Sequence, residues 1–348
     1  MHGQLIALLD KRKVLEFGKE ARSERYVKSF DAWQHLLVML YAVIKRLDSL
    51  REISASMHPE ASKLSHIGIT SLPRRSTLSD ANARRSELVF EKTYRDLYRT
   101  YRGELSSDSR NRQNPKWFNK LQIPKWFNKL QIIDSTTISL FSNLIFKGVG
   151  RRPRTGRKKG GIKAHTIIHA NEGVPSDIKF TSAATNDSFM LQPSQYAKGD
   201  VVAMDRAYID YGKFEKLTEN GVVYVTKLKK NLKYTVQKDV MYQNDDGRMA
   251  YRVQDVTFTK EAGKGNVIVH HARIVTYADI KKTRAKLVSL LSNDMETDAK
   301  DIVDIYRKRW EIELLFKQLK QNFPLRYFYG ESANAIKIQI WAHILFRN

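Results

Sequence analysis

The sequence predicts an α/β protein: a mixed sheet flanked by helices, preceded by an all-helical segment and interrupted by a β-rich block. Apolar residues recur at steps of three and four over residues 1–105 of the 348-residue chain, which is the pattern of helices. From residue 130 onward this pattern gives way to short β-type runs separated by polar turns. A strongly helical segment at 298–322 follows, and Pro324 closes it.

The helical segment is followed by an expected linker at 106–129, because residues 106–114 include no apolar residue. Within the linker the nine residues PKWFNKLQI occur at 115–123 and again at 124–132. A single perfect copy is unlike a structural repeat, whose units span tens of residues and recur several times. It indicates a local duplication of coding DNA, with the first copy looped out.

The remaining chain divides into three segments. Strands are expected at 130–140, 162–169, 176–180, 201–204, 222–228, 251–258 and 267–277, with a helix at 211–217. We therefore expect the first part of a core at 130–220, a β-rich insertion at 221–286, and the last part of the core at 287–348.

The charge balance indicates a polyanionic partner. The 61 Lys and Arg residues outnumber the 37 Asp and Glu residues and leave a net charge of +24, which favours nucleic acid as the partner. No apolar run reaches the roughly 18 residues of a membrane-spanning helix, and the N-terminus lacks the pattern of an export signal. We expect a cytoplasmic protein with no membrane association. The absence of cysteine excludes disulfides, thiolate catalysis and cysteine-based zinc sites, so any metal would bind oxygen or imidazole.

Two aspartates each follow an apolar strand pattern. Asp134 comes directly after the residues LQII, and Asp205 comes directly after VVAM. If the two strands are neighbours, these carboxylates can meet. Taken singly, each aspartate is better explained as the cap of a following turn or helix, since Asp commonly has that role.

A stripe of charged and aromatic residues follows one face of the helical segment. Its members, spaced by three, four, four and three residues, are Tyr306, Arg309, Glu313, Lys317 and Lys320. At helical geometry they lie within an arc of about 80°. The spacing suits an exposed face with Glu-to-Lys pairs, and equally a site in which a carboxylate lies among cations. Trp310 beside the stripe favours the site, because an aromatic among basic residues suits stacking on an unpaired base.

Three motifs thus occur in order: IIDST at 132–136, MDRAY at 204–208, and the stripe at 306–320. They resemble the two aspartate motifs and the YREK motif of the insertion-sequence-four family of bacterial DDE transposases. That family usually has Gly in place of Ala207 and places a β-rich insertion between the second aspartate and the glutamate. The resemblance covers about residues 30–348.

The resemblance implies a ribonuclease-H-like catalytic core in which Asp134, Asp205 and Glu313 bind two Mg²⁺ ions, with Mn²⁺ able to substitute. The residue types agree, because Mg²⁺ prefers carboxylates, waters and substrate phosphate. Two such ions can activate an attacking water or 3′-hydroxyl and stabilise the leaving oxygen.

The same resemblance implies a transposase of a bacterial insertion sequence, which cuts DNA and transfers strands in a cut-and-paste reaction. Its partners would be double-stranded DNA, both the terminal inverted repeats of the element and the target, and a second copy of the chain, since cutting two ends in concert implies a homodimer on DNA. It would be associated with the bacterial nucleoid.

The resemblance also assigns DNA contacts. Tyr306, Arg309 and Lys320 would hold backbone phosphates, and Trp310 and Arg206 would lie near a flipped base.

Three further basic residues are expected to contact DNA. Lys163 lies in a segment that resembles a strand of the family. Arg74 and Arg75 flank the start of a helix expected at residue 76, where a helix N-terminus and arginines could dock on phosphates. A solvated basic face explains this pair equally well. If Arg74 and Arg75 do contact DNA, residues 1–105 form a DNA-binding domain, and we expect this.

Two other functions remain open. A ribonuclease-H-fold nuclease would share the carboxylates and lack strand transfer. A decayed, inactive transposase or a DNA-binding regulator is the second alternative, favoured by the duplication before Asp134 and by an apolar helical pattern at 336–345 that still continues near Asn348, beyond which family members usually extend.

Overall fold

The computed structural model describes residues 2–105, 124, 126–139, 161–243, 250–261, 266–281, 284–322 and 328–347. The chain divides into two compact units. One unit comprises residues 1–104, 138–162 and 315–348, and the other comprises residues 105–137 and 163–314. No helix in the described ranges is long and apolar enough to cross a membrane. The first copy of the duplicated nonapeptide lies outside the described residues.

The first unit is helical, as the apolar spacing of residues 1–105 predicts. Its N-terminal helices are α1 (His2–Ala7), α2 (Lys11–Glu20), α3 (Ala32–Lys45), α4 (Leu50–Met57), α5 (Ala61–His66), α6 (Arg75–Arg84) and α7 (Leu88–Tyr101), followed by the short helix η1 (Arg102–Leu105). Helix α3 is the core of this unit and is buried from Ala32 to Val43. The Asp31 side chain caps it by accepting a hydrogen bond from the amide of Gln34.

A helix from the far end of the sequence completes this unit. Helix α12 (Ala333–Arg347) packs against α3, α6 and α7. The side chain of Asn334 donates hydrogen bonds to the backbone carbonyls of Asn82 and Arg85, and thereby fixes α12 to the end of α6. The sequence pattern assigns 287–348 to a single core segment, whereas the structure groups residues 315–348 with the N-terminal helices.

The second unit is built on one nine-stranded sheet in the order β3-β2-β1-β4-β5-β9-β8-β7-β6. The strands are β1 (Leu130–Ser139), β2 (Gly161–His169), β3 (Pro175–Ser182), β4 (Val201–Met204), β5 (Val223–Lys227), β6 (Thr235–Gln243), β7 (Ala250–Glu261), β8 (Val267–Lys281) and β9 (Arg284–Ser292). Strands β1, β4 and β5 run parallel, and β5 pairs antiparallel with β9. The sheet is therefore mixed, as the sequence predicts.

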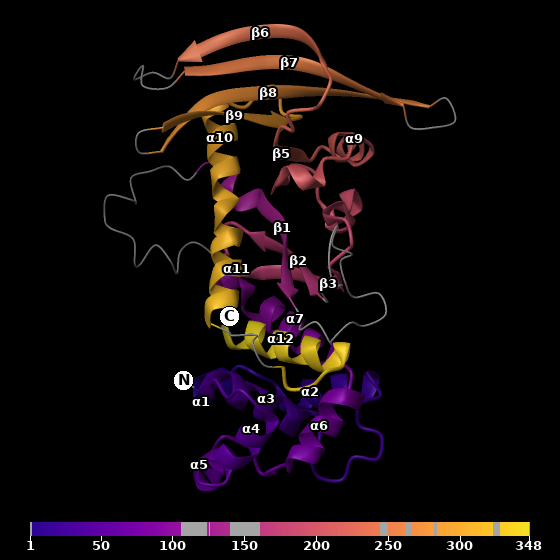
Figure 1. The fold of residues 1–348 in the computed structure, drawn as a ribbon, viewed down its shortest axis with the longest axis vertical. Coiled ribbons are helices and arrows are strands. Elements are labelled where there is room, and N and C mark those ends of the chain that lie inside the picture. Colours follow the sequence, from indigo (N-terminus) through magenta and orange to yellow (C-terminus); the bar gives the residue numbers. More distant parts are fainter. Residues whose placement is uncertain are drawn as a thin grey trace, which may run out of the picture. The chain divides into compact units, whose positions relative to one another are not determined.

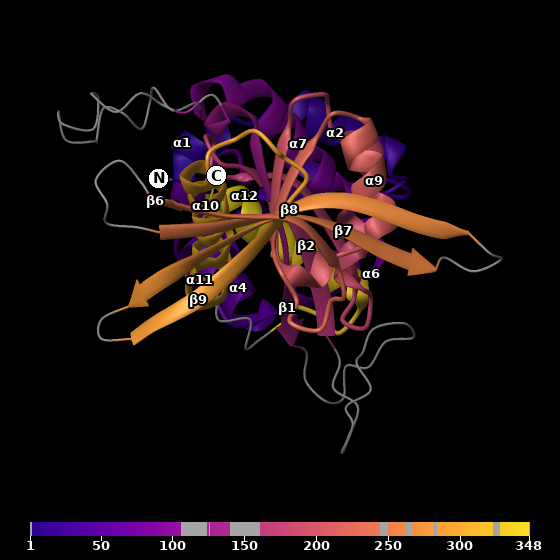
Figure 2. The same cartoon turned by 90° about the horizontal axis from the view of Figure 1, so that it is seen from above.

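Helices cover both faces of the central strands. Helix α9 (Tyr211–Glu219) connects β4 to β5 and packs against β5 and β8, whereas α10 (Ala299–Lys308) packs against β4, β5, β8 and β9. Figures 1 and 2 show these two helices on opposite sides of the central strands. Helix α11 (Trp310–Asn322) follows α10 and belongs to this unit as far as Leu314. The unit also includes four short helices: η3 (Phe127–Lys129), η4 (Asp187–Met190), η5 (Pro193–Gln195) and η6 (Arg206–Tyr208).

The β-rich insertion differs from its expected form. It is not a separate block, because β9 pairs with β5 on one side and with β8 on the other, so that the hydrogen bonding of the sheet is continuous. The expected boundary at residue 220 falls before β5, which pairs with β4. The strand patterns at 251–258 and 267–277 are confirmed, while β6 and β9 have no predicted counterpart. Strand β6 is exposed along almost its whole length, and its residues therefore carry no apolar alternation.

A buried polar group lies between α9 and the insertion strands. His270 of β8 is fully buried and shares one hydrogen bond with the Tyr224 hydroxyl, at 2.6 Å from Nε2, and another with the Glu215 carboxylate at Nδ1. Burial lowers the pKa of His270, although Glu215 acts in the opposite direction. Because both ring nitrogens have partners, this histidine has a structural explanation.

Candidate active site

The register of two parallel strands brings the two aspartates together. Ile133 of β1 pairs with Met204 of β4, so the next residues, Asp134 and Asp205, lie side by side. Strand β1 continues to Ser139, so Asp134 lies within its strand, whereas Asp205 follows the last residue of β4. The condition set by the sequence, that the two strands be neighbours, is met.

Both carboxylates project from the same face of the sheet. Ile133 and Met204 belong to a buried cluster together with Phe214 of α9. Successive strand residues point to opposite faces. Asp134 and Asp205 therefore point away from α9, to the face on which α10 packs.

Neither aspartate caps a helix. Asp205 precedes η6, but its side chain makes no capping hydrogen bond, and no described residue donates a hydrogen bond to its carboxylate. Asp134 accepts a hydrogen bond of 2.8 Å from the amide of Ser135, its neighbour within the strand. The structural role that would best explain either aspartate alone is thus absent.

The third carboxylate reaches Asp134 through an arginine. Arg309 donates from Nη1 to Oδ2 of Asp134 at 3.3 Å and from Nη2 to Oε1 of Glu313 at 2.5 Å. Its side chain is only 12% exposed and lies over the ring of Tyr306 at 5.4 Å. Arg309 therefore joins two of the three acidic residues, and its cation partly neutralises them.

Burial and like charge both act on Asp134. Burial, together with the neighbouring charges of Asp205 and Glu313, raises the pKa of Asp134 from 3.8 to about 6 against the opposing effects of the Ser135 amide and Arg309. Carboxylates that repel one another in a partly buried site favour a cation between them. In the described chain that cation is Arg309.

The helix carrying the stripe is interrupted at Arg309. The sequence predicts one helix over 298–322, but α10 ends at Lys308 and α11 begins at Trp310. The Arg309 amide donates to the Tyr306 carbonyl, and the Ile312 amide donates to the Arg309 carbonyl; both bonds span three residues. Such tightened turns arise within helices at sites under strain or at functional hinges.

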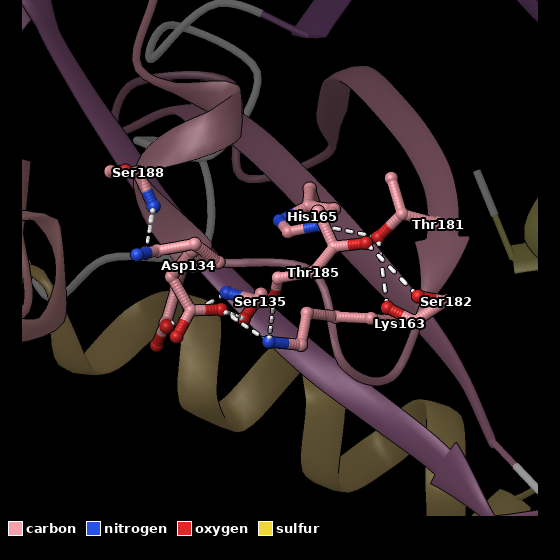
Figure 3. Close-up of polar contacts among 10 residues, drawn as sticks. Asp134, Ser135, Lys163, His165, Thr181, Ser182, Thr185 and Ser188 are labelled. Carbon is pink, nitrogen blue, oxygen red and sulfur yellow. Dashed lines mark hydrogen bonds and ion pairs between the residues drawn. The ribbon is translucent and has the colours of Figure 1, made fainter. Parts of the chain in front are cut away.

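A second polar network supports β1 from its other face. The Ser135 hydroxyl donates to Asp187 at 2.5 Å, and Lys163 Nζ donates to the same carboxylate oxygen at 2.9 Å and to the Thr185 carbonyl at 2.7 Å. Burial raises the pKa of Asp187, but the hydrogen bonds from Ser135 and Lys163 outweigh it and hold that pKa below its usual value. Figure 3 shows Lys163, Ser135 and Thr185 converging beside Asp134. The sequence did not single out Asp187 as a site residue; the signal was its place in the segment TNDS at 185–188.

The same polar network holds Lys163, which the sequence predicts to contact DNA. Its side chain is 12% exposed and paired internally, so its contacts are with Asp187 and Thr185 rather than with solvent.

The other expected DNA-contacting residues differ in exposure. Trp310 is 57% exposed at the start of α11, and Arg206 is exposed at the start of η6. Arg74 and Arg75 are exposed at the start of α6, in the helical unit. The side chain of Lys320 lies outside the described residues.

The oxygen donors of this site are of the kind that suits a hard cation. Carboxylates are the ligands that Mg²⁺ and Mn²⁺ prefer, and Asp134 and Asp205 are adjacent. Among the described side chains, no group of three acidic or histidine residues could hold a metal ion as it stands. Arg309, itself a cation, contacts both Asp134 and Glu313.

Carboxylates clustered on neighbouring strands, with an arginine beside them, are the residue types that a metal-assisted phosphoryl-transfer site uses. Residues 125–348 match a family model described as the transposase DDE domain, and this match covers more than half of the chain. The chain therefore belongs to the family of DDE-domain transposases. Residues 1–70 match a second model, a domain of unknown function. Transposases of the DDE family generally use divalent metal ions.

Three relatives are transposases by name. The chain is 29% identical over 276 residues to a putative transposase of Sinorhizobium fredii, covering 78% of this chain and 69% of the relative. It is 27% identical over 281 residues to a putative insertion-sequence transposase of Synechocystis, with the same coverage of each. A probable insertion-sequence transposase of Geobacillus stearothermophilus is 25% identical over 212 residues, which are 61% of this chain and 53% of that relative. Together with the family match, they indicate an insertion-sequence transposase.

A solved piggyBac transposase synaptic complex with hairpin DNA is also similar, at a TM-score of 0.40 and 13% identity, covering 99% of this chain and 72% of that one.

Proposed function

We propose that the chain cuts DNA at the ends of its element and transfers the cut strands, with Asp134, Asp205 and Glu313 as ligands of two Mg²⁺ ions. The observation that carries this proposal is the β1–β4 register, which sets Asp134 beside Asp205. The bridge through Arg309 to Glu313 supports the third member. Manganese should substitute, since it accepts the same oxygen ligands.

The bound ions would activate the attacking hydroxyl and stabilise the leaving oxygen in an in-line displacement at phosphorus. The chain's own part is to hold three carboxylates on rigid elements. Two are fixed by paired strands, while Glu313 lies on α11, directly after the turn at Arg309. A small change at this turn would bring Glu313 to the aspartates once Arg309 releases them.

Arg309 would then bind substrate phosphate. Its Nε is buried and has no hydrogen-bond partner among the described residues. A buried donor without an acceptor is costly, and a phosphate oxygen would satisfy it together with the Nη atoms freed by metal. Tyr306 holds the guanidinium in place through its ring. Exposed Trp310 and Arg206 would contact an unpaired base nearby.

We also propose that the sheet and its helices form a ribonuclease-H-like core and that the N-terminal helices form a DNA-binding domain. Parallel strands β1, β4 and β5 with helices on both faces support the first assignment. A homodimer on DNA would cut two ends in concert.

The test uses the full chain, Mg²⁺ and duplex DNA taken from the flanks of its coding sequence. Asp134→Asn, Asp205→Asn and Glu313→Gln should each lower nicking by at least about 100-fold, since each removes metal charge while keeping shape. DNA binding in EDTA should stay within about twofold of the unchanged protein. Asp255→Asn on β7 is the matched control. Near-normal nicking by any one of the three variants would remove that residue from the triad.

Joining separates a transposase from a nuclease. A pre-cut end with a free 3′-hydroxyl, incubated with target plasmid and Mg²⁺, should become covalently joined. Cleavage without joining would favour a nuclease, and binding without cleavage would favour an inactive relative or a regulator.

A further inference from the structure

A basic hollow lies on the helical unit, between the loop that joins α2 to α3 and helix α6. It has a volume of about 520 Å³ and is lined by residues of the segment 22–30 and by residues of 76–85. Small-ligand sites commonly have volumes of 300–1,000 Å³, so the hollow has room for a group of nucleotide size. All of its lining belongs to one compact unit.

The charge of the hollow is strongly positive. Arg22, Arg25, Lys28, Arg84 and Arg85 line it, against one acidic residue, Asp80. The Asp80 carboxylate is paired with Arg84 at 2.6 Å.

Of the other cationic residues that line the hollow, some support its wall and others are available to bind an anion. Arg85 is buried and donates to the backbone carbonyls of Phe30 and Asp31, so it supports the wall. The side chains of Arg22 and Lys28 are exposed, and neither side chain forms a hydrogen bond or an ion pair with a described residue. Two cations are therefore available to an anion.

An aromatic side chain stands at the edge of the same hollow. Tyr26 is 86% exposed, and Arg25 lies 5.0 Å from its ring centroid and donates to its hydroxyl at 3.2 Å. The backbone of Tyr26 has φ 62°, and that of Arg22 has φ 52°, a left-handed conformation that is unusual for large side chains. The loop thus holds a tyrosine ring in solvent beside unpaired cations, which is the arrangement that stacks on a base and neutralises its phosphate.

We propose that this hollow binds an unpaired nucleotide of a DNA strand, with the base on Tyr26 and the flanking phosphates on Arg22 and Lys28. The first turn of α6 supplies a further wall: Ser76 and Thr77 line the hollow, and the N-cap residue Arg74 makes no side-chain cap. The partial positive charge of that helix end adds to the same potential. The inference rests on the proposed action on DNA and adds to it a docking site for single-stranded DNA. The loop side of this site, residues 22–30, lies in the region that matches a domain of unknown function.

The experiment compares three labelled DNAs with the full chain in EDTA: a blunt duplex, the same duplex with a short 3′ tail, and that tail with abasic sites in place of its bases. The unchanged protein should bind the tailed duplex roughly tenfold more tightly than the abasic form, in the range of one stacked base. Tyr26→Ala should remove this preference, and Tyr26→Phe should keep it. Because the side chain is exposed, neither change should alter the thermal melting of the protein.

The charge is tested separately. Arg22→Ala with Lys28→Ala should weaken binding of the tailed duplex and reduce the slope of log K against log salt by about 1.4, at roughly 0.7 per single-strand phosphate. Arg12→Ala and Tyr242→Ala, on α2 and β6, are matched controls for an exposed arginine and an exposed tyrosine.

Two results would overturn the proposal. The first is that Tyr26→Ala still prefers the tail that has bases. The second is that the double variant weakens binding of the blunt and the tailed duplex equally, which would mean that the hollow binds the backbone of duplex DNA. Both readouts are independent of metal. If the carboxylate variants lose nicking but Tyr26→Ala has no effect on binding, only the proposed nucleotide site is rejected. If the protein binds the tail but never nicks DNA, only the proposed reaction is rejected.

Discussion

Replacing Asp134 by Asn should stabilise the metal-free protein at neutral pH while weakening its stabilisation by metal. Burial and the charges of Asp205 and Glu313 raise the pKa of Asp134 from 3.8 to about 6, so ionising it in the folded state costs free energy. At about 1.36 kcal/mol per pKa unit, the cost approaches about 3 kcal/mol. The Asp134 side chain is 18% exposed, so solvent screens it little. Asn removes the charge and keeps an acceptor for the Ser135 amide.

The sign of the effect depends on pH. Well below pH 3.8 the carboxyl is protonated in both the folded and the unfolded chain, and the cost is absent. As the pH rises through about 6 the cost reaches its full value. The free energy of unfolding of Asp134→Asn should therefore exceed that of the unchanged protein by up to about 3 kcal/mol at pH 7, and by only about 0.5 kcal/mol at pH 4.

Urea denaturation in EDTA at the two pH values measures this difference, and Asp255→Asn again serves as control. In a parallel series with MnCl₂, the unchanged protein should gain stability through ligand binding and the variant should gain much less. A variant that is no more stable than the unchanged protein at pH 7, or a gain that persists undiminished at pH 4, would show that Asp134 does not carry a destabilising charge.

Three further outcomes are expected. Tyr224→Phe should lower the free energy of unfolding by about 1–3 kcal/mol, because it leaves a buried nitrogen of His270 unsatisfied; a change below about 0.5 kcal/mol in urea denaturation would contradict this. Asp187→Ala should reduce the nicking rate by about tenfold or more with little change in DNA affinity, because Ser135 and Lys163 lose the acceptor that holds β1; equal losses in rate and affinity would refute a positioning role. Affinity for DNA should fall steeply between low and physiological salt, as the net charge of +24 implies; a shallow slope would refute phosphate contact as the main source of affinity.

The elements that carry the site could be predicted from local sequence. The runs before Asp134 and Asp205 are short, mostly apolar and rich in β-branched residues, a local composition that favours strands. Their pairing could not be deduced in the same way, because the register of β1 on β4 is set by contacts between residues far apart in sequence. The adjacency of the two aspartates therefore emerges only from the fold.

For the helix that carries the stripe, the sequence predicts the helix but not its interruption. Its periodicity predicts one continuous helix, and nothing in the sequence at Arg309 breaks it, since arginine is a good helix former. The interruption arises where Arg309 contacts both Asp134, on another element, and Glu313. Strand β6 escaped prediction for a different reason, because an exposed strand buries no face and leaves no apolar alternation.

The packing of α12 on α3 affects the order in which the protein can mature. Ribosomal synthesis delivers α3 early, and α3 is apolar and buried along almost its whole length in the finished unit. Its partner α12 is made only after the entire sheet has emerged. During that interval α3 lacks part of its cover, a state prone to chaperone binding and to association between nascent chains. A complete helical unit, with any DNA docking that depends on it, thus becomes available only to chains translated through residue 347.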